Sequence, residues 1–134
     1  MNGKLLYFDS SAIVKFVALE RESSALFEFA KSWPERVSSQ LARVEVLRAL
    51  RRGGGSAALR RRAEDVLGRM ALIRVDDAVI AAAAEIGPSD LRTLDSLHLA
   101  TALSLGTQLG ILVAYDRRLI EAARIAGVET ASPS

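Results

Sequence analysis

The feature that most constrains this fold is a set of short apolar runs that stop at polar residues. Leu5–Phe8 and Ile111–Ala114 are continuously apolar, and Leu72–Val75 is a third candidate strand. Strands that are apolar on both sides belong in a parallel sheet covered on both faces, whereas half-exposed strands alternate. Segments with helical signals separate these runs, and that order favours an α/β fold.

Capping and turn residues predict where the remaining elements begin and end. The predicted N-caps are Ser10 or Ser11, Ser56, Asp76 or Asp77, and Thr93. The predicted helices cover residues 12–19, 23–33, 40–52, 57–69, 77–86, 94–105 and 117–126. Residues 36–39 form either a short strand or a cap, residues 128–130 an edge strand, and residues 131–134 a frayed tail.

Composition narrows the classes of protein that this chain can be. It has 134 residues, half of them hydrophobic, and a formal net charge of +2. This suits a single domain over residues 1–134 and excludes a disordered chain. With no cysteine and one histidine, His98, disulfides, thiolate zinc sites and His-rich metal sites are excluded. A bound metal must then use mostly oxygen ligands, as Mg²⁺ and Mn²⁺ do.

The location predicted from the sequence is the cytoplasm, with no role for a membrane. The apolar run within residues 1–8 is too short for the core of a signal peptide. No apolar stretch approaches the roughly 18 residues that a membrane-spanning helix needs. The lack of cysteine fits the same compartment.

Two acids follow predicted strands. Asp9 comes directly after Leu5–Phe8, and Asp116 comes two residues after Ile111–Ala114. Ligands of open parallel sheets bind outside the carboxyl ends of the strands, so carboxylates at two such ends can be neighbours. The alternative is that each acid is only a loop residue or a helix N-cap, which is a common role for Asp.

Two further acids interrupt apolar helix faces. At about 100° per residue, Glu45 lies beside Ala42, and Asp95 shares a face with Leu99. A buried carboxylate needs a charged partner or a metal ion. The alternatives are an ion pair between Glu45 and Arg48, and a position at the helix start where the helix dipole favours Asp95.

Convergence of these four acids would indicate a metal site. Each pair of carboxylates at about 5 Å repels by roughly 3 kcal/mol at an effective dielectric near 20. A fold gains no stability from such a gathering, whereas a divalent cation turns the repulsion into attraction. Such a site can orient and deprotonate a water molecule and neutralise the charge that develops on a phosphodiester.

Four segments carry motifs that are weak alone and specific together. In sequence order they are Leu6–Ala12, Arg43–Ala49, Leu91–Ala102 and Leu112–Leu119. In order and spacing they resemble the PIN domain, and within it the VapC toxins of bacterial and archaeal toxin–antitoxin pairs. The resemblance implies a three-layer α/β/α fold with a central parallel sheet of four to five strands. It also implies a Mg²⁺- or Mn²⁺-dependent endoribonuclease that cuts RNA to halt translation.

The same resemblance assigns roles to the acids. The family's acidic quartet falls on Asp9, Glu45, Asp95 and Asp116. It implies that the three aspartates hold the metal, while Glu45 completes the shell or orients the water. Ala114 stands where the family usually has Thr or Ser, which removes a hydroxyl group. Ser10 is a candidate to restore some of that polarity, with helix capping as its alternative role.

Basic residues are concentrated between Arg48 and Arg74, where eight arginines oppose two acids for a local balance of +6. Such a cluster attracts phosphate backbones, and the alternative is a solvated helix face. The predicted RNA contacts are Arg60, Arg61 and Arg62 in this cluster, and Arg92, Arg117 and Arg118 close to acids.

His98 and the aromatic side chains each have a packing and a functional interpretation. His98 follows Asp95 by three residues and is either a packed, hydrogen-bonded core residue or a general base. The aromatic residues of the first two helices are Phe16, Phe27, Phe29 and Trp33. They fill the core or, as the resemblance implies, line a groove for the C-terminal segment of a VapB antitoxin. The family resemblance also implies a homodimer.

Other classes of protein share parts of this pattern. An aspartyl-phosphate phosphatase needs a second acid two residues after Asp9, where Ser11 stands. A receiver domain needs an acid pair after its first strand, whereas Asp76 and Asp77 come later. A non-catalytic PIN-like module that only binds RNA or a partner is the main alternative. RNA cleavage that is lost with EDTA separates the enzyme from such a module.

Overall fold

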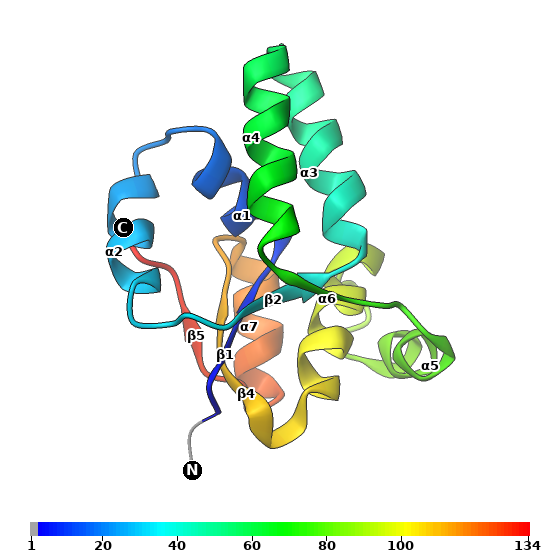
Figure 1. Ribbon diagram of the computed structural model, residues 1–134. Coiled ribbons are helices and arrows are strands. Elements are labelled where there is room, and N and C mark those ends of the chain that lie inside the picture. Colours follow the sequence, from blue (N-terminus) through cyan, green and yellow to red (C-terminus); the bar gives the residue numbers. More distant parts are fainter. Residues whose placement is uncertain (1–2) are drawn as a thin grey trace.

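The computed structural model describes residues 3–134 and has three layers, with helices on both faces of one sheet (Figure 1). Within these residues the sheet has five strands, all parallel, in the order β3-β2-β1-β4-β5. They are β1 (Leu5–Phe8), β2 (Arg36–Ser39), β3 (Ala71–Ile73), β4 (Leu109–Val113) and β5 (Thr130–Ala131). The α-helices are α1 (Ser10–Val17), α2 (Ser23–Ala30), α3 (Leu41–Arg52), α4 (Ala57–Gly68), α5 (Asp77–Glu85), α6 (Thr93–Ser104) and α7 (Arg117–Ile125). A short 3-10 helix, η1 (Gly106–Gln108), precedes β4. The predicted three-layer fold is confirmed, with five strands in the sheet.

β1 is the central strand, and its position explains the apolar run near the start of the chain. It pairs with β2 and β4, so that Tyr7 lies opposite Val37 and Phe8 lies opposite Val113. Leu6, Tyr7 and Phe8 have no exposed surface. A central strand between two helical layers buries both of its rows of side chains, which is why β1 is apolar throughout.

Alternate side chains of β1 reach two separate apolar cores. Leu6 and Phe8 pack with residues of α1, α2, α3 and α4. Tyr7 lies in the other core, with Leu99 of α6 and Leu119 of α7. α5 packs against α6. Nowhere in residues 3–134 is there a helix with the length and apolar character needed to cross a membrane.

The N-cap of α1 differs from the prediction. Asp9 caps this helix, not Ser10 or Ser11, because its Oδ1 atom accepts a hydrogen bond from Ala12 N at 2.9 Å. Ser11 donates its hydroxyl hydrogen to Asp9 instead. A carboxylate is a stronger acceptor than a hydroxyl group, so Asp9 takes the cap and α1 begins at Ser10.

Three other predicted caps have mixed outcomes. Ser56 and Asp76 cap α4 and α5 as predicted. Thr93 does not cap α6, because Arg92 has the extended backbone of the capping position and Thr93 is already helical. The guanidinium group of Arg92 lies near two acids, Asp95 and Asp116.

α2 ends three residues earlier than predicted. Its last helical residue is Ala30, not Trp33. Arg36 Nη2 donates to Ala30 O at 2.8 Å, and Arg36 Nε donates to Trp33 O at 3.0 Å. These bonds hold the chain at and just after the helix end, and Pro34 restricts the residue before it to extended backbone.

The C-terminal residues are held by hydrogen bonds, so the predicted frayed tail is wrong. The edge strand β5 is shifted from residues 128–130 to Thr130–Ala131. Ser132 Oγ donates to Ala114 O at 2.6 Å, and Tyr115 OH donates to Pro133 O at 2.7 Å. The sheet edge therefore continues to order the chain beyond its last paired residue.

Candidate active site

Asp9 and Asp116 lie at the carboxyl ends of adjacent strands. Asp9 follows β1, and Asp9 N donates to Val113 O, the last residue of β4, at 3.1 Å. Asp116 caps α7, because its Oδ1 atom accepts from Arg118 N at 2.8 Å and from Leu119 N at 3.2 Å. The capping interpretation of both aspartates is confirmed, and the same caps place them at the edge where open parallel sheets bind ligands.

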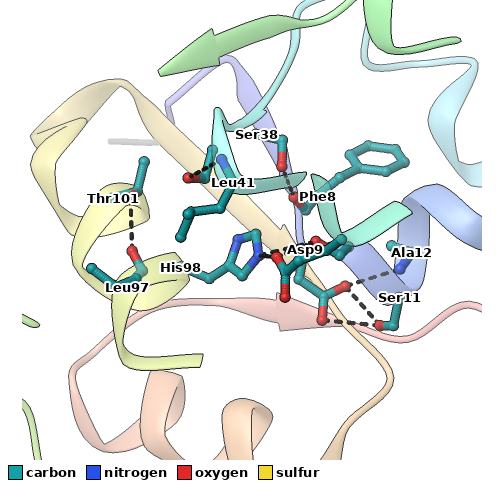
Figure 2. Close-up of polar contacts among 12 residues, drawn as sticks. Phe8, Asp9, Ser11, Ala12, Ser38, Leu41, Leu97, His98 and Thr101 are labelled. Carbon is teal, nitrogen blue, oxygen red and sulfur yellow. Dashed lines mark hydrogen bonds and ion pairs between the residues drawn. The ribbon is translucent and has the colours of Figure 1, made fainter. Parts of the chain in front are cut away.

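Asp9 is the most buried acid at this edge, with 4% of its surface exposed. Ser11 Oγ lies 2.7 Å from Asp9 Oδ1 and 2.9 Å from Oδ2. In Figure 2 dashed lines join Ser11 and Ala12 to the carboxylate of Asp9. Burial raises the pKa of Asp9 to about 6, although the hydrogen bonds from Ala12 and Ser11 oppose that rise. The negative charge of Asp95 raises the pKa further.

Asp95 and Asp116 are joined by Arg92. Arg92 Nη2 lies 3.1 Å from Asp116 Oδ2, and Arg92 Nε lies 3.8 Å from Asp95 Oδ2. Asp95 stands in the first turn of α6, as its helix-start interpretation predicted. Burial raises the pKa of Asp95, and the charge of Asp116 adds to that rise despite the nearby guanidinium. These two acids are therefore close enough to repel each other.

Glu45 is held by two donors. Its Oε1 atom accepts from Ser10 Oγ at 2.6 Å and lies 2.7 Å from His98 Nε2. The partner of Glu45 is thus His98 and not Arg48, because α6 presents the imidazole to this face of α3. Burial alone would raise the pKa of Glu45, but the bonds from His98 and Ser10 outweigh it, so the pKa is lowered.

His98 is buried and hydrogen-bonded, as the packing interpretation predicted, but it also contacts the site. Only 2% of its surface is exposed, and its Nδ1 atom lies 2.8 Å from Tyr7 OH. Its Nε2 atom lies 2.7 Å from Glu45 Oε1. The link from Tyr7 through His98 to Glu45 was not predicted. Two sequence features could have revealed it. Tyr7 has the only hydroxyl group in the apolar run Leu5–Phe8, and His98 is the only histidine of the chain.

The donor chemistry of this edge fits a hard divalent cation, since its groups are mainly carboxylate oxygens. The charge of Asp95 acts on Asp9, and the charges of Asp116 and Glu45 act on Asp95. Across the described part of the chain, however, no three acidic or histidine side chains are already arranged to hold a metal ion. Metal binding by the quartet therefore stays a prediction.

Ala114 is fully buried, and its carbonyl group accepts the bond from Ser132. Ser10 does not cap α1, and its hydroxyl group contacts Glu45 and His98 instead. Ser10 thus places a hydroxyl group beside one of the acids. A compensating role for Ser10 stays a prediction.

The predicted RNA-binding arginines fall into two groups in the structure. Arg60, Arg61 and Arg62 are exposed on α4, and Arg62 Nη2 donates to Phe16 O at 3.2 Å. Arg117 and Arg118 are exposed in the first turn of α7, next to Asp116. Together with Arg92, the second group borders the acids.

Part of the aromatic cluster borders an open hollow. Phe16 and Phe27 pack edge to face with ring centroids 5.0 Å apart. They line a hollow of about 610 Å³ between the first two helices and α4, with Arg36 and Arg69 at its border. Phe29 and Trp33 stack on each other and pack against the first core. Both interpretations of the aromatic residues thus have a counterpart in the structure.

A parallel sheet between two helical layers, with acids at the ends of its central strands, defines a class of α/β/α proteins with an anionic edge site. The chain belongs to the PIN domain family, which it matches over residues 6–125, and within that family to the VapC ribonucleases.

Two relatives from Mycobacterium tuberculosis match almost end to end. The chain is 46% identical to ribonuclease VapC46 over 129 residues, covering 96% of this chain and 98% of that protein. It is 34% identical to ribonuclease VapC47, covering 96% and 97%.

Solved structures of low sequence identity share the fold. VapBC2 from Rickettsia felis, bound to a DNA fragment from its promoter, superposes with a TM-score of 0.75 at 11% identity, covering 97% of this chain and 99% of that chain. VapC20 from Mycobacterium tuberculosis, a sarcin–ricin loop cleaving toxin, superposes with a TM-score of 0.74 at 17% identity, covering 96% and 99%.

Proposed function

We propose that this protein is a metal-dependent endoribonuclease, the toxin of a toxin–antitoxin pair, which hydrolyses phosphodiester bonds in RNA. The observation that carries the proposal is the anionic edge, where strand ends supply Asp9 and Asp116 and helices supply Asp95 and Glu45. The proposal is supported by relatives named ribonucleases, one of them 46% identical.

Asp9, Asp95 and Asp116 would hold Mg²⁺ or Mn²⁺, and Glu45 would complete the shell or orient the attacking water. The bound cation supplies charge neutralisation and acidifies that water. The chain itself contributes orientation, because Ser11 and Ala12 fix Asp9 and the α7 amides fix Asp116. The raised pKa of Asp9 and of Asp95 indicates that these carboxylates gain from a nearby cation.

RNA is the substrate class that the basic residues favour. Arg92, Arg117 and Arg118 border the acids, where they can contact the phosphate that is cut. Arg60, Arg61 and Arg62 lie on α4 and are proposed to contact the RNA backbone further away. We also propose that the protein acts in the cytoplasm, where RNA is translated.

The proposed partner is a VapB-type antitoxin. The hollow at Phe16 and Phe27 suits a segment with apolar side chains, and its arginines suit acidic ones. A solved complex with the same fold is described as a toxin–antitoxin complex from Klebsiella pneumoniae, with a TM-score of 0.70. A homodimer within such a complex is part of the same proposal.

Cleavage of total RNA by the purified protein tests the proposal. We expect cleavage with Mn²⁺ or Mg²⁺, none with EDTA, and none by Asp9→Asn or Asp95→Asn. Asp76→Asn is a matched control, because Asp76 is an exposed N-cap of α5 that accepts from Val79 N at 2.9 Å. If Asp9→Asn and Asp95→Asn cut RNA as well as the wild type does, the proposal is wrong. RNA binding without cleavage would favour the non-catalytic module.

A further inference from the structure

A line of hydrogen bonds runs from the buried core to the acidic edge. Tyr7 OH lies 2.8 Å from His98 Nδ1, and His98 Nε2 lies 2.7 Å from Glu45 Oε1. These residues come from β1, α6 and α3, which are far apart in the sequence. The line therefore ties the central strand and one helical layer to an acid on the other layer.

The hydroxyl group of Tyr7 is not needed for packing. Tyr7 lies in a core whose other members are aliphatic, among them Leu99, Leu112 and Leu119. A phenylalanine would fill the same space without burying a polar atom, whereas a buried hydroxyl group needs a hydrogen-bond partner. The bond to His98 Nδ1 meets this need at 2.8 Å, and the hydroxyl groups of Thr101 and Ser38 also lie close to Tyr7 OH.

The network assigns the position of the imidazole hydrogen. If Tyr7 donates its hydroxyl hydrogen to Nδ1, the ring hydrogen of neutral His98 is on Nε2 and points at Glu45. Ser10 Oγ donates to the same Glu45 oxygen at 2.6 Å. Glu45 then receives two hydrogen bonds on Oε1, which fixes a long and otherwise flexible side chain.

The second oxygen of Glu45 is left for a ligand. No bond to Oε2 is found among residues 3–134, and 23% of the Glu45 side chain is exposed. The short side chain of Asp9 is fixed by its own helix cap, but Glu45 has no such local anchor. His98 and Tyr7 take the role that second-layer residues take around metal ligands.

We propose that Tyr7 and His98 are positioning residues that hold Glu45 with one oxygen directed to a divalent cation, a role that rests on the proposed function. His98 acts through its hydrogen bond to Glu45, and Tyr7 acts by fixing the ring hydrogen of His98. Neither residue contacts the metal or the RNA.

Calorimetric titration of the EDTA-treated, dialysed protein with Mn²⁺ tests this role. We expect Tyr7→Phe to weaken Mn²⁺ binding about 10-fold and His98→Leu to weaken it by up to about 100-fold. His98→Gln should retain part of the affinity, because its amide nitrogen can donate to Glu45. Tyr115→Phe is the matched control, since it also removes one bonded tyrosine hydroxyl group.

Two further measurements separate positioning from a general loss of structure. The melting temperature, and RNA binding in EDTA by fluorescence anisotropy, should stay close to wild type in Tyr7→Phe. With Mn²⁺ held at a fixed subsaturating level, cleavage by this variant should show a lower kcat and an unchanged KM. If His98→Leu does not fold, Tyr7→Phe decides the question alone.

The outcomes distinguish this proposal from the function on which it rests. If the wild type binds Mn²⁺ and cuts RNA while Tyr7→Phe binds Mn²⁺ equally well, only the positioning role is wrong. An equal loss in His98→Gln and His98→Leu would also overturn it, because the donor to Glu45 would then be irrelevant. If the wild type binds no Mn²⁺ and cuts no RNA, both proposals are wrong.

Discussion

Replacing Asp9 by Asn should stabilise the metal-free protein at neutral pH while abolishing cleavage. Asp9 is almost fully buried, and its carboxylate is close enough to Asp95 to be repelled by it. Asn is nearly the same size, is a good N-cap, and can still accept the hydrogen bond from Ala12 N. The substitution therefore removes a buried charge and keeps the local structure.

The size of the effect follows from the pKa of Asp9. The ordinary value is 3.8, whereas burial raises the pKa to about 6 in the folded protein. Well below pH 3.8 the folded and the unfolded states both hold the proton, so Asp9 contributes no difference in stability. Above pH 6 the folded state buries a charge that the unfolded chain exposes to water. Each tenfold change in proton affinity is worth about 1.4 kcal/mol, so the penalty reaches about 3 kcal/mol near pH 7.5.

Urea unfolding of both proteins in EDTA, at about pH 4 and pH 7.5, measures this penalty. The stability advantage of Asp9→Asn should grow by about 2.4 kcal/mol between the two pH values, because part of the penalty is already present at about pH 4 and the other titrating groups are common to both proteins. Mn²⁺ at about 100 times its Kd should then stabilise the wild type by about 2.7 kcal/mol and leave the variant unchanged.

Asp76→Asn serves as the control here as well, because it makes the same substitution at an exposed helix cap. An advantage of Asp9→Asn that is the same at both pH values would refute the reasoning.

Three further predictions test the arginines and the core. Replacing Arg60–Arg62 by Gln should lower the slope of log binding constant against log salt by about 2 for single-stranded RNA in EDTA, and an unchanged slope would dismiss their role. Arg92→Gln should raise Mn²⁺ affinity by up to about fivefold, because it frees Asp116 from an exposed ion pair that stabilises by up to about 1 kcal/mol. The same variant should weaken RNA binding, and weaker Mn²⁺ binding would contradict the prediction. Leu67→Ala should cost about 2–5 kcal/mol in urea unfolding, because Leu67 is 1% exposed, whereas Leu19→Ala, at 78% exposed, should cost little.

Much of the fold was predictable because burial on both faces leaves a clear sequence pattern. The apolar run Leu5–Phe8 became the central strand, and β2 and β5 were expected near their observed places. Helix ends were less predictable, because residues distant in sequence decide them. Arg36 donates to Ala30 O at the end of α2, and Asp9 takes the place of the two serines as the cap of α1.

The candidate site was predictable only as a set of residue types and strand ends. The positions of Asp9 and Asp116 follow from chain order, because parallel strands place their carboxyl ends at one edge. The partner of Glu45 could not be predicted from the sequence of α3, because Arg48 is nearer in the sequence. The observed partner, His98, belongs to α6 on the other side of the sheet. The contacts of Arg92 with Asp95 and Asp116 depend on the loop before α6, and no periodicity in the sequence predicts the backbone of that loop.

Capping and metal binding are compatible roles for the same acids. Asp9 and Asp116 each accept helix amides through Oδ1, and Asp95 stands in the first turn of α6. Three helix N-termini thus lie beside three of the acids. Each N-terminus stabilises a nearby negative charge by about 0.3–1 kcal/mol. That is less than the roughly 3 kcal/mol by which two carboxylates at about 5 Å repel each other. The remaining repulsion helps to raise the pKa of Asp9 and of Asp95, and a divalent cation would remove it.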